Sequence, residues 1–150
     1  MLLYRISKTI YARDREGLGS KLYGGRWNNI GIPCIYTSES RALAILEYAV
    51  NIELTMIPTT LAITIYEVAE LDFFYCNIDD LPANWRNNPA PVSAKEFGSR
   101  LLQDKNYLGI VLPSAIVPQE YNYLINPLSV KANELKVLDQ EDFVFDQRIK

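Results

Sequence analysis

The sequence neighbours of Arg26 indicate that this arginine could bind a ligand. Arg26 follows Gly24 and Gly25 and precedes Trp27 in the stretch GGRWNN. The two glycines allow backbone conformations that other residues avoid, and they leave room for a ligand to approach. A guanidinium is planar and can bind a phosphate or a carboxylate through two parallel hydrogen bonds. This stretch predicts either that Arg26 is presented to an anion or that it is an exposed residue of a structural turn.

Glu47 is the only residue charged at neutral pH in the segment ALAILEYAV, residues 42–50. On a helix it would project from a mostly apolar surface, where an unpaired carboxylate is costly to bury. Glu47 therefore either reaches solvent at the edge of the helix or has a partner inside the protein. Arg26 is the cation that we expect to be this partner.

Other polar side chains could line the same site. Tyr36 and Ser38 are two residues apart at the end of an apolar run, so a strand would place both on one face. The Tyr36 ring could stack on a ligand, or it could belong to the core with its hydroxyl satisfied. Asn122 and Asn126 are four apart in a strand-like stretch and would also share a face. Without a histidine to activate it, Ser114 is expected to donate a hydrogen bond to a ligand or to stabilise a turn.

The sequence contains no histidine, which excludes several classes of active site. Ser-His-Asp and Cys-His nucleophile systems, histidine general bases and histidine-containing zinc sites all require that side chain. Cys34 and Cys76 are too few and too far apart for a structural zinc site, and their apolar neighbours predict buried, reduced thiols. Neither of the glycine-rich phosphate-binding motifs is present. We therefore expect no metal site, and any nucleotide would be held by arginine and polar side chains.

The bulk composition is that of a soluble globular protein. The chain has 150 residues, 49% hydrophobic and 22% charged, with a net charge of −3. We expect residues 1–150 to form a single domain. The acidic balance, the scattered basic residues and the lack of a long apolar run predict no direct nucleic-acid contact and no membrane association. Arg5 and Lys8 stand where a signal peptide would need an apolar segment, so the sequence predicts a cytoplasmic protein.

Apolar periodicity and turn residues predict an α+β fold. A helix is expected to begin at a cap on Ser38 and to run to about residue 51, and a capping box of Ser93 and Glu96 predicts another over 93–105. Residues 71–76 are expected to extend or pair beside the strand at 59–68. Strands outnumber helices and do not alternate with them, which favours α+β over a doubly wound fold. The predicted strands are 2–6, 32–37, 59–68, 71–76, three short strands within 109–126, and one or two in the tail.

Taken in order, these residues resemble the RES-domain family, the toxins of bacterial RES–Xre toxin–antitoxin pairs, named for an arginine, a glutamate and a serine. Relatives often carry a histidine soon after the glutamate, where this chain has Tyr48 to Asn51. The resemblance covers nearly the whole chain and rests on Leu3-Tyr4-Arg5, Gly24-Gly25-Arg26-Trp27-Asn28, Gly31, Tyr36, Ser38, Ala42, Glu47, Pro113-Ser114 and Asn126-Pro127.

The resemblance implies a fold like that of ADP-ribosyltransferases, a split β core of two packed sheets with flanking helices around an NAD cleft. It implies that NAD+ is a substrate rather than a cofactor, and that the nicotinamide–ribose bond is cleaved by hydrolysis or phosphorolysis. By position, Arg26 would bind the phosphates or a ribose and Tyr36 would stack near the nicotinamide. Glu47 would serve the reacting ribose, and Ser114 would complete the pocket. Further NAD+-binding residues would be Gly25, Trp27, Ser38 and Asn126.

The resemblance also implies partners. These are an Xre-like antitoxin whose helix-turn-helix would bind DNA, a second copy of this chain in a homodimer within the complex, and inorganic phosphate if the reaction is phosphorolysis. Two alternatives remain: transfer of the ADP-ribosyl group to a protein target, and a non-catalytic binding module in which Arg26 and Glu47 are structural.

Overall fold

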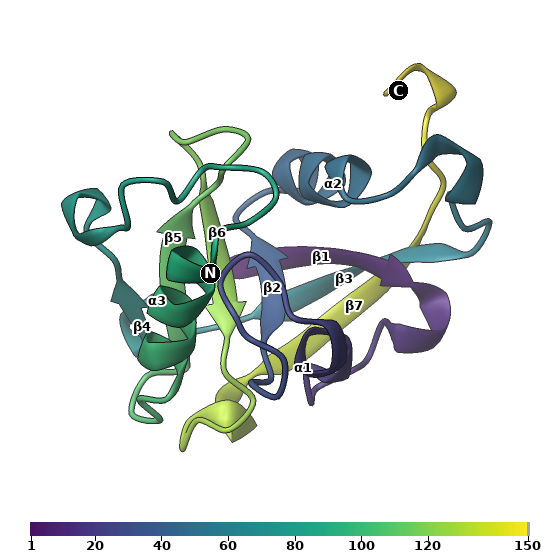
Figure 1. The fold of residues 1–150 in the computed structure, drawn as a ribbon. Coiled ribbons are helices and arrows are strands. Elements are labelled where there is room, and N and C mark those ends of the chain that lie inside the picture. The colour runs from purple at the N-terminus through teal and green to yellow at the C-terminus, as the bar shows by residue number, and fades with distance from the viewer. Residues whose placement is uncertain (150) are drawn as a thin grey trace.

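The strands of the protein form two half-sheets that meet at a corner. The computed structural model describes residues 1–149, and its strands are β1 (Leu2–Lys8), β2 (Ile35–Ser38), β3 (Leu61–Glu67), β4 (Phe73–Tyr75), β5 (Gly109–Pro113), β6 (Tyr121–Ile125) and β7 (Lys136–Phe143). Their order in the sheet is β4-β5-β6-β2-β1-β3-β7. At the corner, β1 and β2 share the register pair Tyr4–Ser38, whereas β1 pairs with β3 along its whole length. Strands β1, β3 and β7 therefore cross the half-sheet formed by β4, β5, β6 and β2 (Figure 1).

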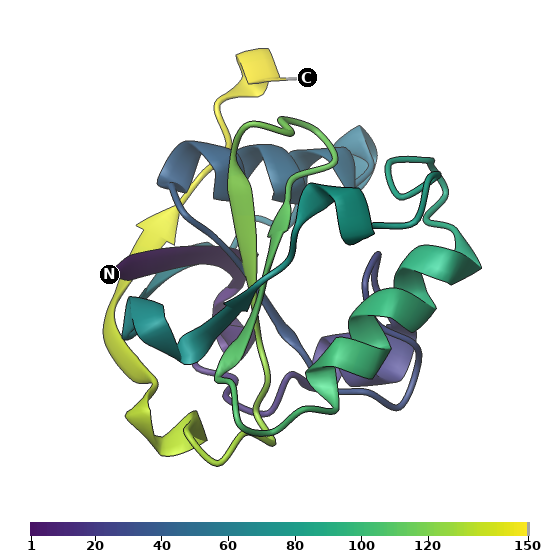
Figure 2. The same cartoon turned by 90° about the vertical axis from the view of Figure 1, so that its left-hand side faces the viewer.

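Helices flank the two half-sheets. Figures 1 and 2 show α2 (Arg41–Val50) along the half-sheet that contains β1 and β3, and α3 (Val92–Leu102) beside β5. The short helix α1 (Leu18–Tyr23) precedes the GGRWNN stretch. Within residues 1–149, no helix is long and apolar enough to span a bilayer. Short 3₁₀ helices span Thr9–Tyr11, Leu54–Met56, Glu70–Asp72, Ile78–Asp80, Ala132–Glu134 and Gln147–Ile149.

The inner faces of the two half-sheets pack against each other. Leu3 and Tyr66, which are opposite each other on β1 and β3, share a buried cluster with Val111 of β5 and Tyr123 of β6. Removal of such apolar side chains from water is the main favourable contribution to folding. The cluster therefore holds the two half-sheets together as one core.

The outer faces are covered by α2 and α3. Ala44 of α2 is buried with Ile6 and Ile63 of the strands beneath it, and Ala94 of α3 is buried with Ile110 of β5. Because β3 and β5 are covered on both faces, their sequences LAITIYE and GIVLP are apolar along most of their length instead of alternating. This architecture confirms the predicted α+β fold with flanking helices, and the two packed layers are the halves of one seven-stranded sheet.

Two strand predictions are wrong. Residues 71–76 were expected beside the strand at 59–68, but β4 lies at the far edge of the sheet and pairs in parallel with β5. Strand propensity identifies an extended segment but not its partner, which depends on where the chain crosses to the other half-sheet. The segment SAIVP, residues 114–118, forms bends and a turn between β5 and β6 instead of a strand.

The predicted helix caps also differ from those observed. Ser38 ends β2, and Ser40 caps α2 instead, with its side chain accepting a backbone hydrogen bond at 3.1 Å. The capping box of Ser93 and Glu96 does not form, because α3 already begins at Val92 and both residues lie inside the helix. In both cases the helix begins one or two residues away from the expected position, which moves the predicted cap out of reach of the free N–H groups.

A partly buried ion pair ties the segment after β6 to the start of β4. Lys131 Nζ lies 2.5 Å from Asp72 Oδ1, and Asp72 is only 8% exposed. The hydrogen bond from the Lys131 ammonium holds the pKa of the Asp72 carboxyl below its ordinary value. A carboxyl of this kind stabilises the folded state above its unfolded pKa of about 3.9, and this contribution is lost as the pH falls through the lower, folded pKa.

We expect Lys131→Met to lower the melting temperature at about pH 7, because Asp72 would keep its charge without its cation. The difference from the unmodified protein should shrink below about pH 4, where Asp72 becomes protonated in the unfolded chain. Lys136→Met is the matched control, since Lys136 and Glu67 form an exposed pair at 3.9 Å, and such pairs contribute little. Melting curves at both pH values test this, and an equal loss at each would contradict it.

Candidate active site

Two cavities meet beside Glu47. The smaller cavity, of about 210 Å³, lies between α2, β1 and β2. The larger cavity, of about 630 Å³, lies between the GGRWNN stretch, α2 and residues 86–90. Pockets for small molecules and cofactors commonly have volumes of roughly 300–1,000 Å³. Because the two cavities share the lining residues Tyr36, Glu47, Asn51 and Asn122, we treat them as one candidate active site.

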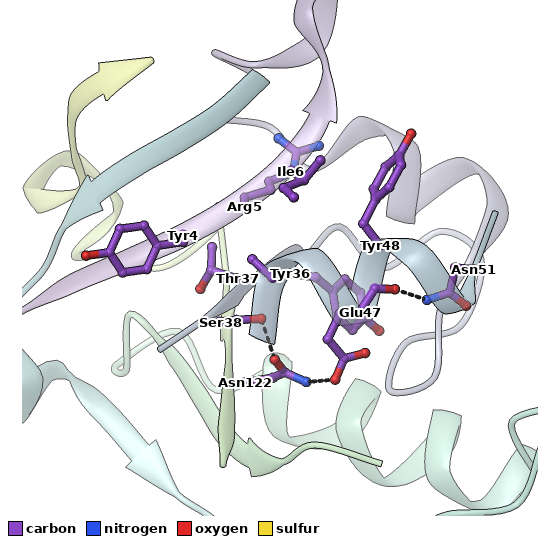
Figure 3. A pocket seen from close by; sticks show the side chains of 11 residues that line it. Tyr4, Arg5, Ile6, Tyr36, Thr37, Ser38, Glu47, Tyr48, Asn51 and Asn122 are labelled. Carbon is purple, nitrogen blue, oxygen red and sulfur yellow. Dashed lines mark hydrogen bonds between the residues drawn. The ribbon is translucent and has the colours of Figure 1, made fainter. Parts of the chain in front are cut away.

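Glu47 is held at the meeting point of the cavities through one carboxylate oxygen. Figure 3 shows the contact of this oxygen with Asn122. Ser114 Oγ donates to Oε1 at 2.7 Å, and Asn122 Nδ2 donates to the same atom at 2.5 Å. Among residues 1–149, no donor reaches Oε2, and the expected ion pair between Glu47 and Arg26 is not formed. Neutral donors therefore take the place of the predicted cation, and the second oxygen is left to accept from a ligand.

Ser114 is placed as a donor to Glu47 and not as a nucleophile. Its side chain is fully buried, and its oxygen accepts hydrogen bonds from the N–H groups of Ile116 at 3.0 Å and Val117 at 3.1 Å. The hydroxyl proton points to Glu47 Oε1. Of the two alternatives that the sequence offered for Ser114, the turn is present, and its hydroxyl donates to Glu47, a partner that the sequence did not predict.

Arg26 reaches the larger cavity while it anchors the loop on the opposite side. Its Nη1 donates to the carbonyl oxygens of Trp85 at 2.9 Å and Asn87 at 2.8 Å. In the described part of the chain, Nε and Nη2 make no hydrogen bond. Arg86 lines the same cavity, and Arg5 lines the smaller one. Since Glu47 is the only acidic side chain among the described lining residues, the cavities favour an anionic ligand.

The Tyr36 hydroxyl fixes the GGRWNN stretch. It donates to Asn28 Oδ1 at 2.7 Å and accepts from the Trp27 N–H at 3.0 Å. Burial raises the pKa of Tyr36 well above its ordinary value, so the hydroxyl stays protonated at neutral pH. A Cβ at Gly25 would lie 2.6 Å from this hydroxyl, so Gly25 makes room for the tyrosine. The ring lines both cavities, which is where the predicted stacking would need it.

Trp27 forms an apolar wall of the larger cavity. It is 3% exposed, and its ring stacks on Trp85 and meets Phe97 of α3 edge-on, with centroids 6.1 Å apart in each pair. A Cβ at Gly98 of α3 would lie 2.0 Å from the Trp27 carbonyl oxygen. The absence of a side chain at Gly98 therefore allows α3 to pack directly against the backbone that carries Arg26.

Asn126 lies outside both cavities. Its Nδ2 donates to the Leu102 carbonyl at 2.7 Å, and its Oδ1 accepts from the Leu128 N–H at 2.9 Å. Four residues of strand span roughly 13 Å, so Asn122 and Asn126 cannot reach the same site even when they share a face. The structure brings Asn122 to Glu47, whereas Asn126 supports the loop beyond β6.

The lining residues that were not chosen from the sequence include Asn122, Arg86 and Arg5. Asn122 had the same signal as Asn126, and only the strand register separates them. Arg86 lies in the predicted loop 77–92, whose length was the only indication of function. Arg5 belongs to a motif that carries the family resemblance. Ser38, which was chosen, lines the smaller cavity and donates to Asn122 Oδ1 at 2.7 Å.

The thiols do not add a nucleophile to this site. Cys34 is buried as predicted, and burial raises its pKa far above the ordinary value. The same prediction is wrong for Cys76, which is partly exposed, although burial still raises its pKa to about 12. Both thiols are free and remain protonated near neutral pH. Within residues 1–149, no group of three His, Cys, Asp or Glu side chains could hold a metal ion.

The two packed half-sheets and the cleft at their corner define the protein as one with an ADP-ribosyltransferase-like fold. The same fold is found in a solved structure described as the M. tuberculosis MbcT–MbcA toxin–antitoxin complex. The two chains superpose with a TM-score of 0.76 and 15% sequence identity, covering 95% of this chain and 84% of that chain. This likeness confirms the predicted fold.

The chain belongs to the RES-domain family, because the RES domain model matches residues 2–146. A relative named Toxin Res, from Photorhabdus laumondii, is 36% identical over 99% of this chain and 97% of its own length. A second Toxin Res, from Yersinia enterocolitica, is 35% identical over 100% of both chains. A Prs ADP-ribosylating toxin from Sphingobium is 33% identical over 95% of this chain and 91% of its own length. The predicted family is confirmed.

We expect Gly98→Ala to destabilise the fold by roughly 1–3 kcal/mol, because the added methyl group would overlap the backbone of Trp27. Gly19→Ala is the control, since a Cβ there meets no atom within 4 Å. Replacing this helical glycine should instead stabilise the protein by roughly 0.5–1 kcal/mol. Thermal denaturation measures both. An unchanged melting temperature for Gly98→Ala would show that α3 and the GGRWNN stretch are not in close contact.

Proposed function

We propose that this protein is the toxin of a toxin–antitoxin pair and that it depletes NAD+ by cleaving the bond between nicotinamide and ribose. The observation that carries the proposal is the Glu47 carboxylate at the meeting point of the two cavities. One of its oxygens is held by Ser114 and Asn122, and the other has no donor among the described residues. The names of the relatives as toxins also support the proposal.

The charge of the larger cavity suits the diphosphate of NAD+. Arg26 uses Nη1 for the loop and retains Nε and Nη2, and Arg86 lines the same cavity. A guanidinium binds phosphate oxygens through charge-assisted hydrogen bonds, often two at a time. We therefore assign the diphosphate and the adenosine to the larger cavity. The ribose that bears the nicotinamide then lies against Glu47, with the Tyr36 ring nearby.

Cleavage of this bond needs little from the protein beyond Glu47. The bond between ribose and nicotinamide lengthens and breaks with both electrons going to the ring nitrogen, so nicotinamide leaves as a neutral molecule without an acid. Positive charge builds on the ribose, as in other oxocarbenium-like transition states. Oε2 of Glu47 accepts a hydrogen bond from a ribose hydroxyl and offsets this charge. One preorganised electrostatic contact of this kind contributes roughly 3 to 4 kcal/mol.

The acceptor of the ribosyl group distinguishes hydrolysis from phosphorolysis. Water would give ADP-ribose, and inorganic phosphate would give a phosphorylated ADP-ribose. Both reactions share the step at Glu47, so the same site supports either one. The arginines of the larger cavity would also attract a phosphate ion.

We expect Glu47→Gln to lower NAD+ consumption by at least roughly a hundredfold. Glutamine keeps the shape and can still accept from Ser114 and Asn122, but it carries no charge to offset that of the ribose. Purified protein would be incubated with NAD+, with and without inorganic phosphate, and the products would be identified by mass spectrometry.

Glu96→Gln, on the exposed face of α3, is the matched control and should leave consumption unchanged. Nicotinamide with ADP-ribose would indicate hydrolysis, and phosphate-dependent turnover would indicate phosphorolysis. Consumption by Glu47→Gln at the unmodified rate would overturn the assignment of Glu47. Absence of turnover by the unmodified protein in both conditions would overturn the proposed reaction and favour transfer to a protein target or a non-catalytic binding module.

ADP-ribosyl transfer to a protein is a second candidate, favoured by the name of the Sphingobium relative, an ADP-ribosylating toxin. The bond to nicotinamide would break in the same way, and a protein side chain would replace water or phosphate as acceptor. NAD+ labelled in its adenosine would be added to a cell extract with the protein. Under the main proposal the label stays in small molecules. Label that remains on an extract protein after denaturation, and is lost with Glu47→Gln, would favour transfer.

We further propose that the partner is an antitoxin of the Xre type, which would carry the helix-turn-helix and bind DNA. The fold neighbour was solved in a toxin–antitoxin complex, which supports this pairing. The net charge of −3 gives the chain itself no basic surface for nucleic acid. We also propose that the toxin forms a homodimer in that complex and acts in the cytoplasm, on cytoplasmic NAD+.

A further inference from the structure

We propose that Ser38 and Asn122 form a positioning pair that sets the orientation of the Glu47 carboxylate for the reaction. This inference rests on the proposed function, because it concerns how the same site is prepared for NAD+. Neither residue is argued to react. Asn122 touches Glu47, and Ser38 acts through Asn122.

The strand register brings the two residues together. Ser38, the last residue of β2, lies directly opposite Asn122 in the antiparallel pair of β2 and β6. Residues opposite each other in such a pair have side chains on the same face and within contact distance. Figure 3 shows the Asn122 side chain between Ser38 and Glu47, with a hydrogen bond on each side. The pair is therefore built into the sheet and does not depend on a loop.

The chemistry of the donors fixes the direction of the Asn122 amide. An ionised carboxylate can only accept hydrogen bonds, so the Nδ2 end of Asn122 must face Glu47. The Oδ1 end then faces Ser38, whose hydroxyl donates to it at 2.7 Å. If the amide were rotated, Oδ1 would face Glu47 Oε1 across 2.5 Å, and two acceptors would repel each other. Ser38, which is 3% exposed, thus holds Asn122 in its productive orientation.

The result is a carboxylate with two unequal oxygens. Oε1 accepts from Asn122 and from Ser114, whose oxygen is itself tied to the backbone after β5. With Oε1 held from β6 and from the β5–β6 turn, the rotation of the carboxylate about its terminal bond is fixed. Oε2 is then directed away from both donors. A fixed orientation matters because small misplacements of a reacting group lower rates strongly.

We expect Asn122→Ala to lower kcat for NAD+ consumption by roughly tenfold to a hundredfold, the effect of losing a hydrogen bond to a charged group. Ser38→Ala removes a hydrogen bond between neutral groups, so it should lower kcat by a smaller factor, roughly twofold to tenfold. KM should change little, because the charge that Glu47 offsets develops in the transition state. If Ser38 acts through Asn122, the two losses are not independent. The double variant should then be no slower than Asn122→Ala alone.

The split between kcat and KM separates positioning from a merely structural role. Loss of the Asn122 N–H leaves Glu47 Oε1 with Ser114 as its donor among the described residues, so the carboxylate can rotate and misplace Oε2. Asn122→Ala and Ser38→Ala should therefore lower kcat at an unchanged KM, whereas a loosened site would also raise KM. The other charged or titratable residues that line the cavities remain in place in these variants: Tyr4, Arg5, Arg26, Tyr36, Tyr48 and Arg86.

Controls match each change. Ser93→Ala removes another serine that donates to an asparagine, Asn84, at 2.8 Å on the surface. Asn133→Ala removes an exposed asparagine. Both controls should keep the unmodified kcat and KM. Melting temperatures of all variants would be measured, and Ser38→Ala, which removes one hydroxyl, provides the test if Asn122→Ala does not fold.

The outcomes distinguish this inference from the proposed function. If the unmodified protein consumes NAD+ and the folded Ser38 and Asn122 variants keep its kcat, or change KM instead of kcat, the positioning role is wrong and the reaction stands. Losses that multiply in the double variant would also contradict the pairing. If the unmodified protein does not consume NAD+, the proposed function fails and the inference fails with it.

Discussion

A carboxylate that is partly removed from water needs hydrogen-bond donors, and the arrangement around the half-buried Glu47 follows from that requirement. Helix α2 places Glu47 over the start of β6. There Asn122 of β6 and Ser114, which follows β5, donate hydrogen bonds to its carboxylate. They converge on one oxygen only if β5, β6 and β2 keep their register. The hydrogen bonds to Glu47 therefore fix α2 relative to the half-sheet of β4, β5, β6 and β2. The apolar side chains beneath α2 fix it relative to the half-sheet of β1, β3 and β7. The site lies at the corner because both half-sheets are needed to build it.

The GGRWNN stretch combines the two roles that its sequence suggested. It is a structural corner, since Tyr36 and Asn28 hold its backbone and Gly25 leaves room for the tyrosine hydroxyl. It also presents Arg26 to the larger cavity. These roles support each other, because a guanidinium directs an anion only when its own backbone is held still. The close packing of α3 on Trp27 contributes to the same rigidity.

The local sequence pattern was sufficient to predict some of the strands and one residue of the site. The apolar runs LAITIYE and GIVLP identify buried strands, and the isolated charge of Glu47 indicates a carboxylate with a partner. The sequence could not identify that partner, because the two donors, Ser114 and Asn122, lie 67 and 75 residues away from Glu47 in the chain. The register of β2 and β6 was also needed to choose Asn122 over Asn126. The same limit explains β4, whose composition predicts a strand but contains no information on which edge of the sheet it joins.

Arg26 anchors the loop opposite it through the backbone carbonyls of residues 85 and 87. Every amino acid carries that carbonyl, so a substitution at position 87 changes the side chain without removing the acceptor. Position 85 is constrained differently, since the Trp85 ring stacks on Trp27. The rim formed by residues 86–90 is therefore free to diverge in charge and shape while the arginine keeps its anchor. Because the backbone anchor and the side chains of residues 86–90 are independent, members of a family can differ in ligand preference while they keep the same fold.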